Sequence, residues 1–333
     1  MREPTTPPDI ERKLLAILRI LAESAPEPVG ARAIAAKLEL EGISLSERTV
    51  RYHLRLMDER GLTRNLGEPG RVITERGREE LENAGVSDKI GFIISKIDTL
   101  AYQSTFDMDT NSGEIILNIS YLAESRLREA LDVMKDIFQA GYCMSDLVYL
   151  RGPGEEIDGQ TVPKGMVGFG TVCTVTLNRV LLKRGIPVNS RYAGLLEISR
   201  DIPLRFTHLV AYEGTTADPT ELFIGSRMTS VREAALRGHG RILASFREVP
   251  AAAEHDLLSA LDHYRHRGLM GVMGVGKAGQ PLLSVPVSVD RIGIAVVAGL
   301  TPIAAVAEAG IPVQNKAMSA LIDFSELKPV YDL

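Results

Sequence analysis

The sequence contains one pattern twice, and this duplication restricts the fold more than any other feature. Residues 113–120 resemble residues 240–247 at an offset of 127. Residues 167–191 resemble residues 292–316 at an offset of 125, and both stretches contain Gly-Ile-Pro-Val. Because two separate blocks keep nearly the same spacing, we predict two copies of one unit, related by an internal pseudo-twofold. The alternative is the ordinary punctuation of an α/β sequence without duplication.

Each copy predicts a strand, a helix, a loop, a strand, a helix and a final strand. The first helix of each copy is expected at residues 127–139 and 254–266, and each is followed closely by glycine. We place the two repeats at about residues 90–202 and 203–330, within one domain of residues 86–333. The predicted fold class is therefore α/β (α+β), with a separate N-terminal module described next.

Residues 44–61 predict one helix whose two ends are both marked. Ser44 and Glu47 fit a capping box, and Gly61 fits a left-handed C-terminal cap. Apolar residues recur at helical spacing on one side, at Val50, Leu54 and Met57. The opposite side carries cationic and aromatic side chains suited to guanine edges and phosphates, namely Arg48, Arg51, Tyr52 and Arg55. A solvated helix face that contacts nothing is the alternative.

The elements around this helix predict a winged helix-turn-helix in residues 1–85. The expected helices are 9–23, 31–41 and 75–83, and the expected strands are 62–66 and 71–74, joined by a Gly- and Pro-containing turn. In such a module the third helix enters the major groove and the hairpin touches the DNA backbone. The residues expected to contact DNA are Ser46, Arg48, Thr49, Arg51, Tyr52, Arg55, Arg64 and Arg71.

Charge argues against general attraction to nucleic acid. Residues 1–85 hold 14 Lys and Arg against 15 Asp and Glu, and the whole chain has a net charge of −5. Non-specific phosphate binding should be weak, so affinity must come from the local patch on residues 48–55. The acidic total also leaves open a winged helix that serves mainly as a protein-binding module.

Composition limits the location of the protein. No run of about 18 apolar residues occurs, so we expect no membrane span. Residues 1–8 lack the apolar core of a signal peptide and are expected to be a short disordered lead, and residues 86–89 a short hinge. The only cysteines, Cys143 and Cys173, exclude a disulfide scaffold and are expected to be buried fillers. A reducing cytoplasm fits this usage.

The start of the second helix in each repeat is the candidate ligand site. Gly299-Leu300-Thr301-Pro302 in one copy corresponds to Cys173-Thr174-Val175-Thr176 in the other. Free amides and the positive dipole end at such starts favour a carboxylate or a phosphate. The residues expected to bind a small dianion are Thr171, Cys173, Thr174, Asn178, Asn189, Arg191, Gly299 and Thr301. The alternative is that these are ordinary capped helices.

Motifs for catalysis and metal binding are weak. Gly271 to Lys277 nearly spells a phosphate-binding loop, but Ala278 stands where the loop requires Ser or Thr. His263 and His266 lack the partners of a metal site, and no nucleophile with a base is recognisable. We therefore expect no cofactor, no metal and no enzyme, with a DNA-binding module fused to an enzymatic domain as the alternative.

The combination of a winged helix with this duplicated module resembles the NrpR family of archaeal nitrogen-regulation repressors. The most specific part is the repeat block, with Thr-Val-Cys-Thr-Val-Thr-Leu-Asn at residues 171–178 and the repeated Gly-Ile-Pro-Val, and the likeness runs from about Ile10 to Leu327. The resemblance implies a repressor of nitrogen-assimilation genes that binds a palindromic operator as a homo-oligomer, a dimer or larger, and is released by 2-oxoglutarate.

The chain has room for one regulatory module, so it resembles the single-module type. The resemblance leaves open a second NrpR-type protein as a partner. It also leaves open a co-repressor that works mainly through protein contacts.

Overall fold

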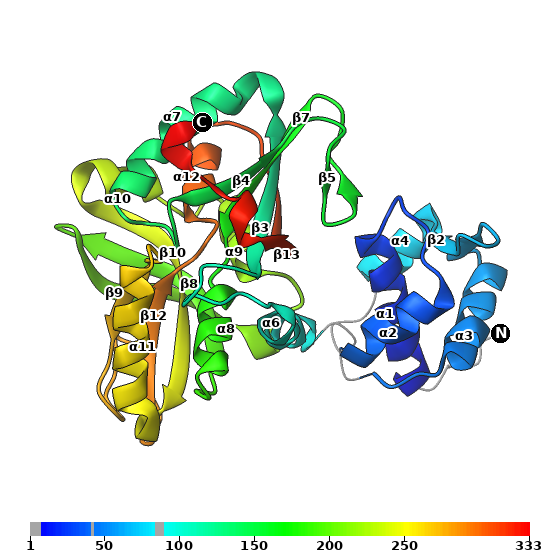
Figure 1. Ribbon diagram of the computed structural model, residues 1–333, viewed down its shortest axis with the longest axis horizontal. Helices are drawn as coiled ribbons and strands as arrows, with labels where there is room; N and C mark the ends of the chain where they lie inside the picture. Colours follow the sequence, from blue (N-terminus) through cyan, green and yellow to red (C-terminus); the bar gives the residue numbers. More distant parts are fainter. Residues whose placement is uncertain (1–7, 41–42, 84–89) are drawn as a thin grey trace. The chain divides into compact units, whose positions relative to one another are not determined.

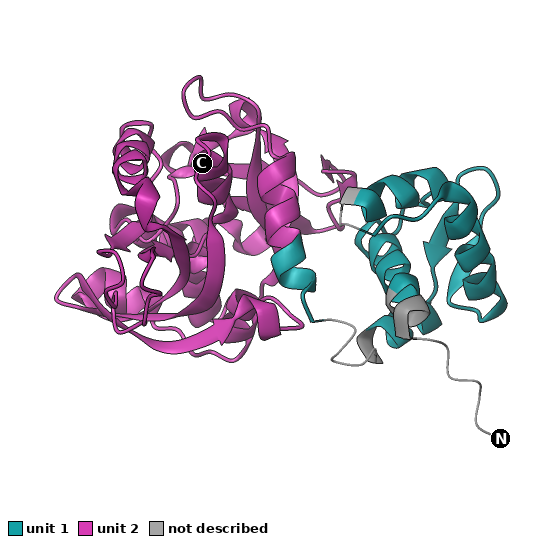
Figure 2. Ribbon diagram, turned by 90° about the horizontal axis from the view of Figure 1, so that it is seen from below, with its two compact units in different colours: residues 1–95 teal, residues 96–333 magenta. Residues whose placement is uncertain are grey.

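The computed structural model describes residues 8–40, 43–83 and 90–333. The chain forms two compact units, residues 1–95 and 96–333 (Figure 2). The division falls within helix α6 (Phe92–Gln103), ten residues after the boundary expected from the sequence. The hinge expected at residues 86–89 and most of the expected N-terminal lead lie outside the described residues.

The first unit is a winged helix, as the sequence predicts. Its elements are α1 (Pro8–Glu23), α2 (Ala31–Leu40), α3 (Glu47–Glu59), β1 (Thr63–Asn65), β2 (Arg71–Ile73) and α4 (Glu75–Asn83) (Figure 1). β1 and β2 pair antiparallel, with Thr63 opposite Ile73. Val50, Leu54 and Met57 of α3 are fully buried among the apolar side chains of α1 and α2. Each such burial contributes about 1.5–3 kcal/mol, so the predicted stripe fixes which face of α3 remains outside.

The N-terminus of α3 differs from the prediction. Ser46, not Ser44, is the N-cap, and its Oγ accepts a hydrogen bond from the Thr49 amide at 3.1 Å. Glu47 is thus the first helical residue and cannot complete the expected capping box with Ser44. The C-terminal prediction is confirmed: Gly61 has φ +73° and its amide donates to Asp58, while the amide of Leu62 donates to Met57. These two bonds form a Schellman motif.

The second unit contains both repeats. The first consists of β3 (Glu114–Ala123), α7 (Leu127–Gln139), β4 (Leu147–Arg151), β5 (Glu156–Ile157), β6 (Gln160–Thr161), β7 (Met166–Val172), α8 (Val175–Lys183) and β8 (Asn189–Ser199). β9 (Ile202–Ala211), α9 (Pro219–Gly225) and α10 (Val231–Arg237) connect it to the second. The second consists of β10 (His239–Pro250), α11 (Glu254–His266), β11 (Val272–Val275), β12 (Arg291–Val297), α12 (Thr301–Glu308) and β13 (Gln314–Asp323), followed by β14 (Lys328–Pro329).

Two five-stranded sheets have matching orders. One runs β13-β3-β7-β4-β14 and the other β9-β8-β10-β12-β11. β3, β7 and β4 correspond in position to β10, β12 and β11, which confirms the duplication. β4 and β11 occupy stretches that the sequence predicts as loop, and this expectation was wrong. Both strands are short, with five residues in β4 and four in β11, and lie between a helix and a longer strand, so their sequence signal was too weak.

The last strand of each repeat joins the sheet of the other repeat. β8, which ends the first repeat, pairs with β10, whereas β13, which ends the second, pairs with β3. The exchange is reciprocal, as an internal pseudo-twofold requires. Residues 90–202 and 203–330 are therefore two copies in sequence that do not form two separate halves in space, because each sheet depends on a strand from the other copy.

The helices exchange in the same way. One hydrophobic core contains α7 of the first repeat and α12 of the second, together with α10 (Figure 1). The other core contains α8 and α11, again one helix from each repeat. The starts of α8 and α12 are thereby brought to the junction between the copies.

Candidate functional site

The outer face of α3 presents its cations to solvent. Arg48, Arg51, Tyr52 and Arg55 are all exposed. Arg51 pairs with Glu47, one turn earlier on the same helix, and the guanidinium of Arg55 lies 5.9 Å from the Tyr52 ring centre. Such exposed pairs exchange easily for phosphate or base contacts, since they contribute at most about 0.5 kcal/mol. The face is free to bind a polyanion.

Two of the expected contacts lie at the start of α3. Ser46 is occupied as the N-cap, and its Oγ lies 2.8 Å from the hydroxyl of Thr49. Ser46 is exposed and Thr49 is partly exposed, so both hydroxyls lie at the N-terminal end of α3 and near solvent. Arg64, on β1 of the wing, is also exposed, as the sequence suggests.

Arg71 has a different environment from the one expected. Its Nε donates to Asp58 Oδ2 at 2.8 Å, and its side chain is only 17% exposed. Asp58 also accepts from the hydroxyl of Thr63 at 2.5 Å. Arg71 therefore links the wing to the end of α3, and a contact between its guanidinium and DNA would have to break this link.

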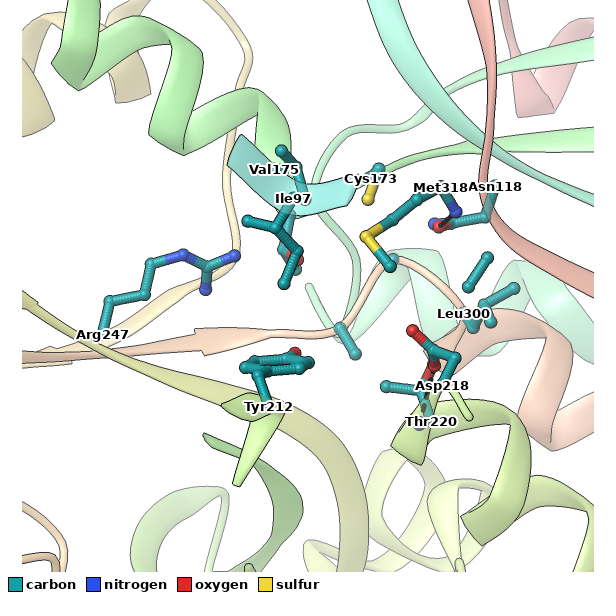
Figure 3. Close-up of a pocket in the computed structure, with 14 residues that line it drawn as sticks. Ile97, Asn118, Cys173, Val175, Tyr212, Asp218, Thr220, Arg247, Leu300 and Met318 are labelled. Atoms are coloured by element: carbon teal, nitrogen blue, oxygen red, sulfur yellow. Dashed lines mark hydrogen bonds between the residues drawn. The ribbon is translucent and has the colours of Figure 1, made fainter. Parts of the chain in front are cut away.

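The starts of α8 and α12 line a small cavity of about 20 Å³ in the second unit (Figure 3). Cys173 and Thr174 come from the first helix start, and Gly299 and Leu300 from the second. A Cβ on Gly299 would lie 2.2 Å from the Val172 carbonyl oxygen and 2.5 Å from Asn118 Nδ2. Only glycine permits this approach between the copies.

Arg247 provides a buried charge at this cavity. It is 1% exposed, and its Nε donates to Asn178 Oδ1 at 2.6 Å while Nη1 donates to Ser245 Oγ at 2.5 Å. Asn178 is held in turn by its own donation to Ser190 Oγ at 2.9 Å. Burial lowers the pKa of Arg247, yet a guanidinium stays protonated in proteins. In the described part of the chain, Arg247 forms no ion pair.

A carboxyl group lies on another side of the same cavity. Asp218 is the N-cap of α9, and its Oδ1 accepts hydrogen bonds from the Thr220 hydroxyl and amide and from the Glu221 amide. Burial raises the pKa of Asp218 above its usual range. Figure 3 shows Arg247 and Asp218 on different sides of the cavity, separated by Tyr212 and Met318. The cavity thus has a cationic and an acidic side.

Three of the eight residues expected to bind an anion line this cavity: Cys173, Thr174 and Gly299. Asn178 lies behind them and positions Arg247. The remaining four are elsewhere: Thr301 Oγ1 donates to backbone carbonyls, Thr171 is buried in β7, and Asn189 and Arg191 lie at the start of β8. Arg191 contacts Glu248 at 3.4 Å and the Tyr192 hydroxyl at 3.2 Å.

Sequence reasoning missed several residues that line the cavity, namely Ile97, Asn118, Tyr212, Asp218, Arg247 and Met318. One signal was present. In the repeat comparison Arg247 falls opposite Ser120, so a cation occupies a strand position that is otherwise apolar or small. Asn118 lies on β3, within the repeat block, and the rest come from α6, the connection after β9 and the last strand, which the repeat pattern does not mark.

The remaining reactive groups do not point to catalysis. Burial raises the pKa of Cys173 to about 11 and that of Cys143 to about 12, so both are neutral thiols at physiological pH. The stretch that resembles a phosphate-binding loop is strand β11, with no helix directly after it. Among residues 8–40, 43–83 and 90–333, no cluster of three metal-binding side chains occurs and no helix is long and apolar enough to cross a membrane.

Comparison with known proteins identifies the family. Residues 90–329 match the NrpR regulatory domains NRD1 and 2. The chain belongs to the NrpR family. Residues 15–81 match the ribonuclease R winged-helix domain, in agreement with the fold of the first unit. The resemblance inferred from the repeat block is thereby confirmed.

Similar NrpR proteins come from methanogens. The Global nitrogen regulator NrpRI of Methanosarcina mazei is 38% identical over 323 residues, which are 97% of this chain and 99% of that protein. The Global nitrogen regulator NrpR of Methanocaldococcus jannaschii is 32% identical over 96% of this chain but only 55% of its own length. A crystal structure of a nitrogen repressor-like protein from Methanococcus jannaschii matches 72% of the chain and 99% of that protein, with 28% identity and a TM-score of 0.61.

Proposed function

We propose that this chain represses nitrogen-assimilation genes by binding a palindromic operator, and that 2-oxoglutarate releases it. Membership of a family of nitrogen regulators supports the target genes. The observation that carries DNA binding is the exposed face of α3, on which three arginines stand free of the core beside a tyrosine. A major groove is wide enough to admit this helix, and Arg binds guanine with two hydrogen bonds.

The wing gives the second contact. Arg64 lies on β1, which follows α3 closely, and a wing beside a recognition helix touches the neighbouring phosphates. Phosphate contacts fix position, whereas the arginines of α3 distinguish bases. Since the net charge of the chain is −5, specific contacts must provide most of the affinity.

A palindromic operator requires two copies of α3 at a fixed separation, so the proposed repressor is a homo-oligomer. 2-Oxoglutarate can release it only by binding more tightly to a state in which the two helices no longer match the half-sites. A small dicarboxylate suits the junction where α8 and α12 begin, because the dipoles of both helices make these ends positive, although the amides of Thr176, Leu177 and Thr301 already donate to backbone carbonyls.

Fluorescence anisotropy of the purified full-length protein tests this function. The probe is a labelled promoter fragment from a nitrogen-assimilation gene, and the control is the same fragment with one half-site scrambled. We expect preference for the intact fragment and its loss on addition of 2-oxoglutarate but not of pyruvate. Equal binding of the two fragments, or indifference to 2-oxoglutarate, contradicts the proposal.

One observation favours a second candidate. Residues 1–85 carry as many acidic as basic residues to within one, which suits a winged helix that binds protein. The chain would then be a co-repressor acting with a second NrpR-type protein. Absence of operator binding by the chain alone, together with binding when that partner is added, would support this candidate.

A further inference from the structure

We propose that two copies of this chain dimerise through the second unit, with an arginine-rich end of each copy against a pair of carboxylates of the other. The proposal rests on the homo-oligomer of the proposed function and adds the surfaces that form it. The carboxylate end consists of Glu114 and Asp323. The arginine end consists of six arginines and three apolar residues, namely Arg200, Arg205, Arg227, Arg232, Arg237, Arg241, Ile202, Leu204 and Leu236.

The arginine end is one continuous surface around α10 and the turn between β8 and β9. The amide of Asp201, in this turn, donates to the carbonyl oxygen of Gly238 at the end of α10 at 3.1 Å. Arg241 of β10 lies opposite Glu197 of β8, which in turn lies opposite Arg205 of β9. Residues directly opposite each other on neighbouring strands point to the same face. The turn, the helix and three strand ends therefore meet at one place.

This end is basic although the chain is acidic. Its six arginines lie among three carboxylates, those of Glu197, Asp201 and Glu233, whereas the whole chain has a net charge of −5. Arg205 donates to Glu197 at 2.8 Å, and Arg237 lies 3.5 Å from Glu233. The remaining four form no ion pair within the part of the chain that the structure describes: Arg200, Arg227, Arg232 and Arg241. The surface thus has a surplus of positive charge.

Large apolar side chains are exposed among these arginines. Ile202 is 65% exposed, Leu236 60% and Leu204 52%, and no lysine occurs at this end. Protein interfaces are enriched in arginine and depleted of lysine, and their cores are apolar. Interfaces with DNA are more polar. The composition therefore favours a protein partner with carboxylates over a DNA backbone.

The carboxylate end has the opposite imbalance. Glu114 of β3 lies directly opposite Asp323 of β13, and both are exposed. Like charges at such positions destabilise a sheet. The hydroxyl and amide of Ser325 donate to Asp323 at 2.6 and 2.9 Å, and these bonds lower its pKa, so the repulsion persists at neutral pH. Neither carboxylate forms an ion pair among residues 8–40, 43–83 and 90–333. A cation from another molecule would relieve this repulsion.

The internal repeat relates the two ends to each other. At the offset of 127 residues Gly240-Arg241 corresponds to Gly113-Glu114, so one structural position carries opposite charges in the two copies. The neighbouring strands β8 and β13 correspond as well. Two chains side by side about a true twofold can set each arginine end against the carboxylate end of the other, which gives two equal contacts. A stable interface takes roughly 20–30 residues on each side, so both ends of each chain are needed.

Sedimentation equilibrium of the full-length protein without DNA tests this contact. The arginine-end variant carries Arg232→Glu and Arg237→Glu, both at exposed positions of α10. The carboxylate-end variant carries Glu114→Arg and Asp323→Asn, in which the amide still accepts from the Ser325 backbone. Thermal unfolding verifies that both variants are folded.

The matched control carries Lys164→Glu and Lys277→Glu. Both lysines are exposed, both belong to the second unit and neither lies at a proposed end. The control changes the net charge as much as the arginine-end variant does. It therefore separates a local contact from the effect of total charge.

We expect the parent to dimerise, and its dimer to weaken as salt is added. Each variant alone should dimerise at least about tenfold more weakly, because like charges then face each other at both contacts. An equal mixture of the two variants should dimerise more tightly than either alone. In that mixed dimer one contact is that of the parent and the other again joins opposite charges. The control should dimerise as the parent does.

A monomeric parent overturns the proposal, and so does a dimer that both variants leave unchanged or that the control weakens equally. If one variant does not fold, the other decides, and an unchanged dimerisation constant in it counts against the contact. An arginine-end variant that dimerises normally but binds operator more weakly, with a smaller salt dependence, shows that these arginines contact DNA and also overturns the proposal.

Operator anisotropy separates this contact from the proposed function. A parent that dimerises as expected but fails to prefer operator DNA refutes the repressor and leaves the contact standing. A parent that binds operator as a dimer, with the dimer indifferent to all four end substitutions, refutes the contact and leaves the repressor standing.

Discussion

Replacing Arg51 with alanine should weaken operator binding while leaving the winged helix folded. Arg51 lies at the centre of the exposed face of α3, and its side chain is 68% exposed. An arginine that binds a base with two hydrogen bonds contributes about 1–3 kcal/mol. A dimer on a palindrome makes this contact twice, so the loss is about 2–6 kcal/mol, on the order of 30-fold to 10⁴-fold in Kd.

Arg51→Ala should change the stability of the protein without DNA very little. The variant breaks the pair with Glu47 on the same helix, but an exposed pair of this kind stabilises by at most about 0.5 kcal/mol. Alanine also has a higher helix propensity than arginine. The melting temperature should therefore stay close to that of the parent, and any loss of affinity reports the DNA contact.

The assay is an anisotropy titration of operator and scrambled DNA at several salt concentrations. Arg60→Ala is the matched control, because Arg60 is an exposed arginine that follows the last residue of α3. A contact with a base lowers the preference for operator over scrambled DNA, whereas a contact with phosphate weakens both and reduces the salt dependence. An unchanged Kd in Arg51→Ala, or an equal loss in Arg60→Ala, refutes the assignment of this face.

Three further substitutions test other parts of the structure. Arg71→Ala should lower the unfolding free energy of the winged helix by about 1–2 kcal/mol, because it breaks a half-buried ion pair with Asp58. Chemical denaturation measures this change, and unchanged stability would show that the pair does not hold the wing to α3. Burial, and secondarily the charge of Lys13, lower the pKa of His53, so the unfolded chain binds the proton more readily and stability should fall as pH drops below about 6.5. Melting curves of His53→Leu from pH 7 to 5 should lose part of that slope, and an identical slope would contradict it. Ile97 is 2% exposed, so Ile97→Ala should lower the unfolding free energy of the second unit by about 2–5 kcal/mol, and chemical denaturation that shows no loss would contradict its burial.

Local patterns in the sequence predicted the first unit well. The spacing of Val50, Leu54 and Met57 determines which side of α3 is buried, and the same side is buried in the structure. The sequence predicts Ser44 as the N-cap of α3, whereas the structure has Ser46, because both serines precede the helix and only backbone geometry distinguishes them. A motif of four residues shows that a helix begins nearby without fixing the first helical residue.

Pairing between distant segments could not be read from the sequence. The repeats predicted which strands and helices exist, but β8 bonds to β10 and β13 bonds to β3 across the boundary between copies. Hydrogen bonds between backbones leave no residue pattern, so two independent halves and two interleaved halves have the same periodicity. The exchange brings the starts of α8 and α12 together, and it therefore determines the cavity.

Duplication alone would give a symmetric cavity, and the departures from symmetry indicate what it can bind. Arg247 falls opposite Ser120 in the repeat comparison, and Gly299 falls opposite Cys173. Ser120 bonds to Asn315, whereas Arg247 bonds to Asn178 and Ser245, so only one copy directs a charge toward the cavity. A ligand at such a junction meets one cationic and one acidic side, since Asp218 comes from the connection between the repeats and has no counterpart. Both ends of 2-oxoglutarate are carboxylates, so the acidic side favours such a ligand only while Asp218 carries a proton, and burial raises the pKa of Asp218 in that direction.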